Sequence, residues 1–347
     1  MLYVTTRSNR DVYTANRALC ENRAPDGGLF VPFRMPEFSY EQIMSLAEKN
    51  FSQRMADILN LLFRTRLTGW DIDFCVGRYP VRLAPMSHRV VIGECWHNTD
   101  WTFEWFAEQL VELLRGREEP DEEAGDWPLI GVRIAVLFGI FGELLKTKDV
   151  SPSAPMDVAV ASGDLSGAMA AWYARSWGLP IGNIIICTNE NAFLWDLLHR
   201  GELRTGSVAA KTSTPECDRV LPRDLERLIC ACGGPLEVGK YLSACSSGSV
   251  YAPNDGILKP MREGVYISVV SEKRMLSAIP NLYRSGGYIA GSYTALCHSG
   301  LQDYRARTGE SRPALVISER SPGCDQEIVA AAMGITVKEL KNRMKKA

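Results

Sequence analysis

The sequence predicts an α/β protein built on a mostly parallel β-sheet with helices on its faces. Two apolar runs, at residues 157–161 (DVAVA) and 183–187 (NIIIC), flank a helical pattern at 165–177 that is closed by a glycine. Continuous apolar runs are typical of strands buried on both faces, and a helix between them is the usual crossover that joins parallel strands. Further strands are expected at 264–270 and 314–318.

The first 95 residues are predicted to form an α+β unit of their own. A PDGG turn at 25–28 precedes a short strand, and two amphipathic helical patterns follow at 38–50 and 51–67. Residues 96–347 are then expected to form the large α/β domain.

Other segments have equally direct patterns. A strand is expected at 89–92, a helix at 101–114, and a long, buried apolar helix at 127–145. The acidic stretch 115–126 (RGREEPDEEAGD) lies between the two helices and is expected to be an exposed linker. The final segment, 325–347, is predicted to be helical with a basic end.

Composition and charge argue against several classes of function. The chain has 347 residues, with 39 Lys and Arg against 41 Asp and Glu, and hence a net charge of −2. Such a balance supplies no general attraction for nucleic acid or an anionic membrane, so neither is expected as a partner. The N-terminal residues lack the apolar stretch of a signal peptide, and a cytoplasmic protein is expected. The ten cysteines include no CxxC pair and the four histidines are scattered, so no metal site is predicted.

Three segments keep the order and approximate spacing of one enzyme family. They are residues 24–32 (APDGGLFVP), 161–191 (which contains GLPIGN and TNEN) and 214–227 (which ends in DLER). On these motifs the chain resembles threonine synthase, a pyridoxal-phosphate enzyme of fold type II, the tryptophan synthase β-like architecture. The resemblance implies a lysine that holds the cofactor as a Schiff base, glycine-rich amides that bind its phosphate, and conversion of O-phosphohomoserine to threonine.

The lysine that the resemblance implies is missing. Residues 97–109 (HNTDWTFEWFAEQ) match the family's lysine segment, and Glu104 occupies the lysine position. An imine needs a primary amine, which a carboxylate cannot supply, and no lysine lies between Lys49 and Lys146. We therefore expect no catalytic residue here and no bound cofactor; pyridoxal phosphate is expected only if the family function is retained.

The phosphate-binding loop that the resemblance implies is altered. The family's GNFGD segment reads GDLSG at residues 163–167 of this chain. The aspartate of GDLSG stands where the cofactor phosphate would bind, and it is expected to cap the following helix. A serine at the end of the 314–318 strand matches the family's hydroxyl partner of the pyridine nitrogen. The vestigial cofactor-binding candidates are Ser162, Gly163, Asp164, Ser166, Gly167 and Ser318.

The family's small cofactor domain has no counterpart in the sequence. Gln109 and Ser162 lie 53 positions apart, and the interval contains the acidic linker and one apolar helix but no Ser/Gly-rich strand, loop and helix. We therefore predict that this domain is excised near residues 115–155. His97, Asn189 and Glu190 remain as substrate-binding candidates.

The sequence favours a threonine synthase-like pseudoenzyme with a binding or assembly role. One alternative is a cofactor-independent enzyme, or a binder of a small metabolite such as an amino acid, that uses the vestigial cleft. A second alternative is an active threonine synthase, so whether the chain is an enzyme stays open. The partners expected are a protein or a second copy of the chain, because an excised domain exposes apolar surface, and a small metabolite.

Overall fold

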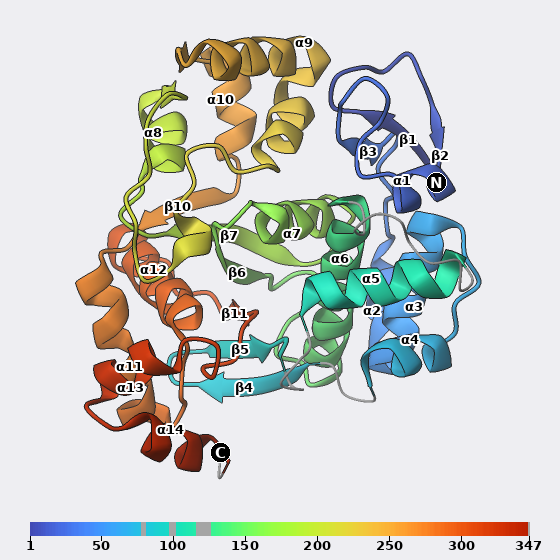
Figure 1. Cartoon of the computed structure of the whole chain (residues 1–347). Helices are drawn as coiled ribbons and strands as arrows, with labels where there is room; N and C mark the ends of the chain where they lie inside the picture. The colour runs from blue at the N-terminus through green and yellow to red at the C-terminus, as the bar shows by residue number, and fades with distance from the viewer. Residues whose placement is uncertain (78–80, 97–101, 116–125, 346–347) are drawn as a thin grey trace.

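A six-stranded sheet forms the centre of the molecule in the computed structural model, which describes residues 1–77, 81–96, 102–115 and 126–345 (Figure 1). All neighbouring strands are parallel except the hairpin at one edge. The predicted α/β class with a mostly parallel sheet is therefore confirmed. In spatial order the strands are β10 (Val265–Val269), β7 (Ile181–Thr188), β6 (Met156–Ala161), β11 (Ala314–Ser318), β5 (Val90–Glu94) and β4 (Arg82–Met86).

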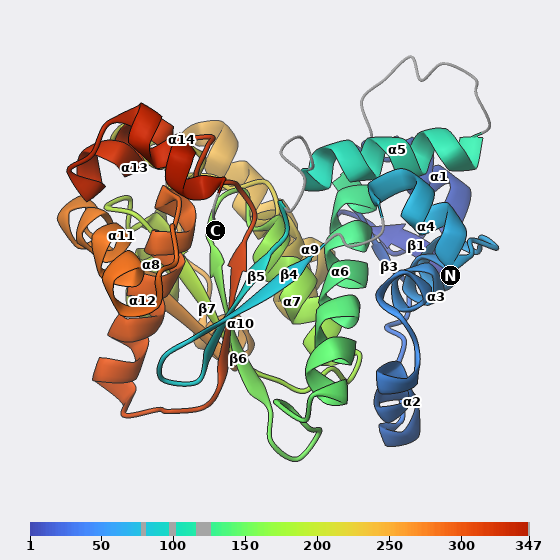
Figure 2. The same ribbon diagram turned by 90° about the horizontal axis from the view of Figure 1, so that it is seen from below.

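Helices cover both faces of this sheet, which Figure 2 shows from its edge. On one face lie α6 (Asp126–Lys146) and α7 (Ser166–Ser176), and on the other lie α11 (Glu272–Gly286) and α12 (Ser292–Thr308). Successive residues of β6 alternate between two hydrophobic cores, with Val158 and Val160 in the core of α6 and α7 and Ala159 in the core of α11 and α12. Burial on both faces explains why the strands read as continuous apolar runs.

The N-terminal unit combines a small antiparallel sheet with four helices. Its strands are β1 (Leu2–Thr5), β2 (Tyr13–Thr14) and β3 (Phe30–Pro32), in the order β2-β1-β3. Its helices are α1 (Ala15–Cys20), α2 (Tyr40–Ser45), α3 (Phe51–Phe63) and α4 (Gly69–Val76), with the 3-10 turn Leu46–Glu48 after α2.

Helix α3 packs along α6 and joins this unit to the large domain. The fully buried Arg54 of α3 donates to the carbonyl of Gly139 at 3.1 Å and pairs with Glu143 at 2.5 Å. The missing side chain of Gly142 makes room for the Arg54 guanidinium. Among the described residues α6 is the one helix long and apolar enough to cross a membrane, and 94% of its apolar window is buried in the core. Its length and hydrophobicity are thus explained by packing, as the sequence predicted.

The β4–β5 hairpin forms one edge of the six-stranded sheet. Strand β4 pairs antiparallel with β5, and Pro85 of β4 lies opposite Val91. Strand β5 pairs in parallel with β11. The hairpin therefore belongs to the large sheet, although the predicted N-terminal unit, residues 1–95, includes it.

The remaining elements surround the sheet. The predicted C-terminal helix is two helices, since Gly334 takes a left-handed conformation with φ 65° between them. Of the predicted acidic linker, 115–126, residues 116–125 lie outside the described residues, whereas its two ends, Arg115 and Asp126, belong to the flanking helices. The other elements are α5 (Phe103–Arg115), α8 (Phe193–Arg200), β8 (Leu203–Arg204), the 3-10 turn Pro215–Cys217, α9 (Leu225–Ser247), β9 (Val250–Tyr251), α10 (Asp255–Arg262), α13 (Gln326–Met333) and α14 (Val337–Met344).

Candidate functional site

A polar cleft of about 250 Å³ lies at the carboxyl ends of β6 and β11. In α/β proteins this end of a parallel sheet is the usual place for a ligand, because loops and helix N-termini meet there. Charged groups of both signs line the cleft. The carboxylates are Glu104, Asp164, Glu216 and Glu319, and the guanidinium groups are Arg133, Arg219 and Arg320.

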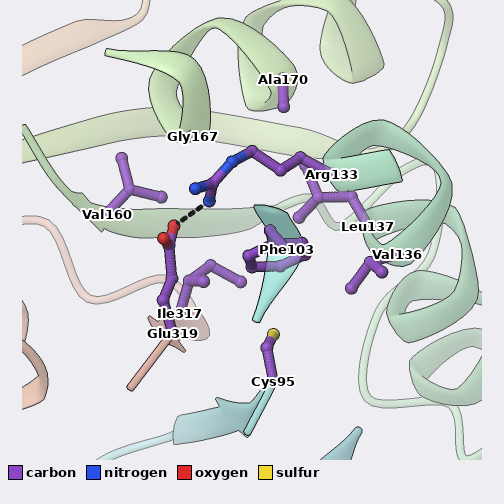
Figure 3. A pocket seen from close by; sticks show the side chains of 10 residues that line it. All are labelled: Cys95, Phe103, Arg133, Val136, Leu137, Val160, Gly167, Ala170, Ile317 and Glu319. Atoms are coloured by element: carbon purple, nitrogen blue, oxygen red, sulfur yellow. Dashed lines mark hydrogen bonds and ion pairs between the residues drawn. The ribbon is translucent and has the colours of Figure 1, made fainter. Parts of the chain in front are cut away.

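Arg133 of α6 crosses the floor of this cleft. Its side chain extends from the helix to Glu319, directly after β11, and forms an ion pair with it (Figure 3). A second nitrogen lies 3.4 Å from the Glu104 carboxylate of α5, and the guanidinium lies 4.3 Å from the ring centre of Phe103. Burial alone would lower the pKa of Arg133, but Glu319 and Glu104 outweigh it and raise the pKa. Arg133 is therefore a permanent buried cation.

The loop before α7 supplies the opposite wall. Gly163 and Leu165 both have left-handed conformations, with φ of 44° and 70°, and the Asp164 carboxylate turns back onto the helix. It accepts hydrogen bonds from the Ser166 N–H at 2.9 Å and the Ser166 hydroxyl at 2.6 Å. Asp164 thus binds the first N–H of α7, but the N-cap position that the sequence predicted for it is occupied by Leu165.

Two arginines hold Asp164 in its charged form. Arg223 pairs with Asp164 and, at 2.5 Å, with Asp126 at the start of α6. Burial raises the pKa of Asp164, but Arg223 and Arg133 outweigh this effect and leave the pKa below its ordinary value. The carboxylate is therefore ionised at neutral pH.

Most of the predicted loop residues meet in this cleft. Ser162, Gly163, Asp164 and Ser166 all line it, and Glu104 faces them from α5. The predicted candidate Gly167 lies in the first turn of α7, where an added Cβ would be 3.1 Å from a Glu319 oxygen.

Three other predicted residues that the structure describes do not line the cleft. Ser318 is buried beneath it, where its hydroxyl accepts from the Trp96 indole at 2.8 Å and lies 2.6 Å from the Thr294 hydroxyl. Asn189 is buried and organises a turn through its bond to Asp218 at 2.7 Å. The two remaining candidates are Glu190, whose carboxylate accepts from the backbone N–H of Glu272 at 3.3 Å, and His97, which lies outside the described residues.

Sequence reasoning missed the charged residues that complete the cleft. Arg133 interrupts an apolar helix, and an arginine in such a helix must find a buried partner. Glu319 follows a buried strand at its carboxyl end, where ligand-facing residues gather. Both signals were present in the sequence. Glu216 and Arg219 lie within the motif at residues 214–227, where no charge or helical pattern marked them as residues of a cleft.

The described residues of the cleft do not fit the pyridoxal phosphate that the resemblance implies. No lysine is among the residues that line it. The Ser166 N–H, which could bind a phosphate at the start of α7, is already bound by Asp164. A second carboxylate, Glu319, lies beside the same turn. The site therefore offers no amine for the aldehyde, and at the start of α7 an internal carboxylate already holds the N–H that a phosphate would use.

Comparisons with known proteins point to one family. The family model for the threonine synthase N terminus matches residues 2–78. Threonine synthase-like 1 of Mus musculus is 27% identical over 252 residues, which are 67% of this chain and 30% of that protein. Threonine synthase of Saccharomyces cerevisiae is 24% identical over 186 residues, 49% of this chain and 36% of that protein. The aligned part thus spans little more than a third, at most, of these curated relatives.

Solved structures agree on the fold. The PLP-bound threonine synthase from Brucella melitensis superposes with a TM-score of 0.85 at 17% identity, covering 96% of this chain and 92% of that one. The yeast threonine synthase structure gives a TM-score of 0.83 at 17% identity, and the match covers 99% of this chain and 94% of the yeast chain. The predicted fold type II architecture is confirmed.

Proposed function

Because this chain has the threonine synthase fold and a threonine synthase N-terminal domain, we propose that it is a threonine synthase-like protein without pyridoxal-phosphate chemistry, which acts by binding. One observation carries the proposal. The side chain at the expected Schiff-base position is Glu104, and its carboxylate pairs with Arg133. A carboxylate cannot form an imine.

The ligand class that the cleft suits best is a small zwitterion such as an amino acid. Carboxylates and guanidinium groups line the same 250 Å³ space, so an ammonium and a carboxylate of one ligand both find partners of opposite charge. Arg219 contributes a guanidinium whose described contact is the bond from its Nε to the Glu216 carbonyl at 3.0 Å. Binding of this kind needs no covalent step. A protein partner, a second copy of the chain and a cytoplasmic location stay predictions.

An absorbance measurement tests the loss of cofactor chemistry. The purified chain is incubated with pyridoxal phosphate and dialysed, with a threonine synthase treated in parallel as the positive control. We expect the imine band to survive dialysis in the control and to disappear from this chain. A stable imine on any lysine of the chain would contradict the proposal.

A thermal-shift screen then tests the binding role. A ligand that prefers the folded state raises the melting temperature, and the rise grows as the ligand concentration exceeds the dissociation constant. We expect at least one amino acid to raise it in the wild-type chain and a weaker rise in the Arg219→Gln variant, whose exposed position leaves the fold intact. Equal shifts in both proteins would exclude Arg219 from the site, and no shift with any amino acid would contradict the ligand class.

A further inference from the structure

We propose that Asp164 is an internal anion that occupies the anion position at the start of α7, so that this position is closed to phosphate in the wild-type chain. The proposal concerns the internal-anion network, defined as Glu104, Arg133, Asp164, Arg223 and Glu319. It rests on the proposed function in one respect, namely that no cofactor phosphate uses this position.

The N-terminus of α7 is an anion position by its geometry. The first N–H groups of an α-helix lack partners within the helix and carry the positive end of its dipole. In this 11-residue helix the Ser166 N–H is bound by the Asp164 carboxylate at 2.9 Å. The carboxylate is covalently part of the loop that precedes α7, so it is present at the Ser166 N–H without any binding step. An external anion must displace it.

Two guanidinium groups, each with a buried and unpartnered Nε atom, provide the independent evidence that this position is built for an anion. Arg133 is 7% exposed, and its Nε has no hydrogen-bond partner among the described residues. The Nε of Arg223 is likewise buried and without a described partner. Both arginines act electrostatically on Asp164 and lower its pKa. Two arginines, each with one buried N–H that has no described acceptor, thus act on one carboxylate.

The network also connects the secondary-structure elements around the cleft. Arg133 joins α6 to α5 through Glu104 and to the end of β11 through Glu319. Arg223 joins the loop before α9 to the α7 loop and the start of α6. A bound cofactor with its phosphate at this turn would have to compete with these ion pairs. The internal charges therefore keep the site assembled without a ligand.

Space for an external anion exists once the carboxylate is gone. A Cβ built on Gly163 meets no atom within 4 Å, so the wall of the cleft is open next to Asp164. In the Asp164→Gly variant the Ser166 N–H is released, and Arg223 keeps Asp126 as a partner. Inorganic phosphate can then bind where the carboxylate lay.

Thermal unfolding with inorganic phosphate tests the proposal. Wild type and Asp164→Gly are melted in phosphate and in chloride at equal ionic strength. We expect no phosphate-specific rise for wild type and a rise of a few degrees for the variant, since phosphate binds only its folded state. A matched control is Asp325→Gly. Asp325 accepts from the Ser292 N–H at 2.7 Å and from its hydroxyl at the start of α12, in the same arrangement.

This control tests the role of the two arginines separately from that of the helix N-terminus. Asp325 feels the charge of Arg320 but forms no ion pair with an arginine in the described structure, where Arg320 pairs with Glu216. Its variant should therefore lose stability with a smaller phosphate-specific rise than Asp164→Gly. A rise in wild type, no rise in Asp164→Gly, or equal rises in the two glycine variants would each overturn the proposal.

A second variant keeps the test valid if Asp164→Gly does not fold. Asp164→Asn retains an acceptor for Ser166 and removes the charge, and we expect a phosphate-specific rise above that of wild type. No difference from wild type would also overturn the proposal. The result is distinguishable from a failure of the proposed function, which is decided by imine formation in the wild-type chain.

Discussion

Replacement of Arg133 by methionine tests whether the ion network of the cleft stabilises the fold. Methionine keeps an apolar stem against Phe103 and removes the guanidinium with its pairs to Glu319 and Glu104. A hydrogen bond to a charged group contributes about 1.5–3 kcal/mol. A desolvated cation–π contact contributes up to about 2 kcal/mol.

Solvent reduces this loss, because the freed carboxylates are partly exposed. The side chains of Glu319 and Glu104 are 28% and 57% exposed, so water can take over some of their interactions. We therefore expect Arg133→Met to lower the free energy of unfolding by about 3 kcal/mol, the lower end of what breaking a buried ion pair costs. Urea unfolding at equilibrium measures the change, with an unaltered m-value as the sign that the folded state is intact.

A double variant makes the test specific to the pair. Arg133→Met with Glu319→Leu leaves no uncompensated carboxylate next to Gly167, so it should lose less stability than the sum of the single variants, by about 1–2 kcal/mol. Arg200→Met is the control, since Arg200 forms an exposed i,i+4 pair with Asp196 and should change stability little. Additive single effects at Arg133 and Glu319 would refute the reasoning.

Two further predictions concern packing and pH. Gly142→Ala places a methyl group on the buried Arg54 guanidinium and should lower the free energy of unfolding, measured in urea, by about 3 kcal/mol. The control Gly239→Ala, which lies in open space on α9, should raise it by about 0.5–1 kcal/mol. Equal changes in the free energy of unfolding would contradict the packing argument. Burial, with the neighbouring Arg305, lowers the pKa of His298 from 6.5 to about 4. The unfolded chain is therefore protonated first, and about 3 kcal/mol of stability is lost as the pH falls from 6.5 to 4. The His298→Gln variant should lose less stability than wild type over this pH range. Parallel curves of unfolding free energy against pH for the two proteins would contradict this prediction.

The parallel core could be predicted because its strands are buried on both faces. Residues 157–161 and 183–187 contain almost no polar interruption, and the glycine after the intervening helix marks its end at the right place. The pairing of the hairpin at residues 82–94 could not be predicted in the same way. Its partner, β11, lies more than 200 positions later in the chain, and short local patterns do not record such distant pairing.

In the candidate site, too, residues close in the sequence could be predicted together, whereas residues that meet only through tertiary packing could not. Residues 162–166 are consecutive and run from the end of β6 into the start of α7, so locating one of them locates the others. Arg133 and Glu319 meet only because α6 packs next to the end of β11. Ser318 and Glu319 are neighbours, but successive side chains point in opposite directions at the end of a strand. The cleft therefore contains Glu319, while the predicted Ser318 faces the layer beneath it.

The hairpin edge also affects how copies of this chain can meet. An exposed edge strand offers unpaired backbone groups on which another chain can add a strand and begin to aggregate. In β4, Pro85 has no N–H to donate, and the exposed Arg82 adds a charge that a second strand would have to desolvate. Strand addition at this side of the sheet is thereby disfavoured. The sequence of β4 protects the molecule against sheet-to-sheet aggregation through this edge.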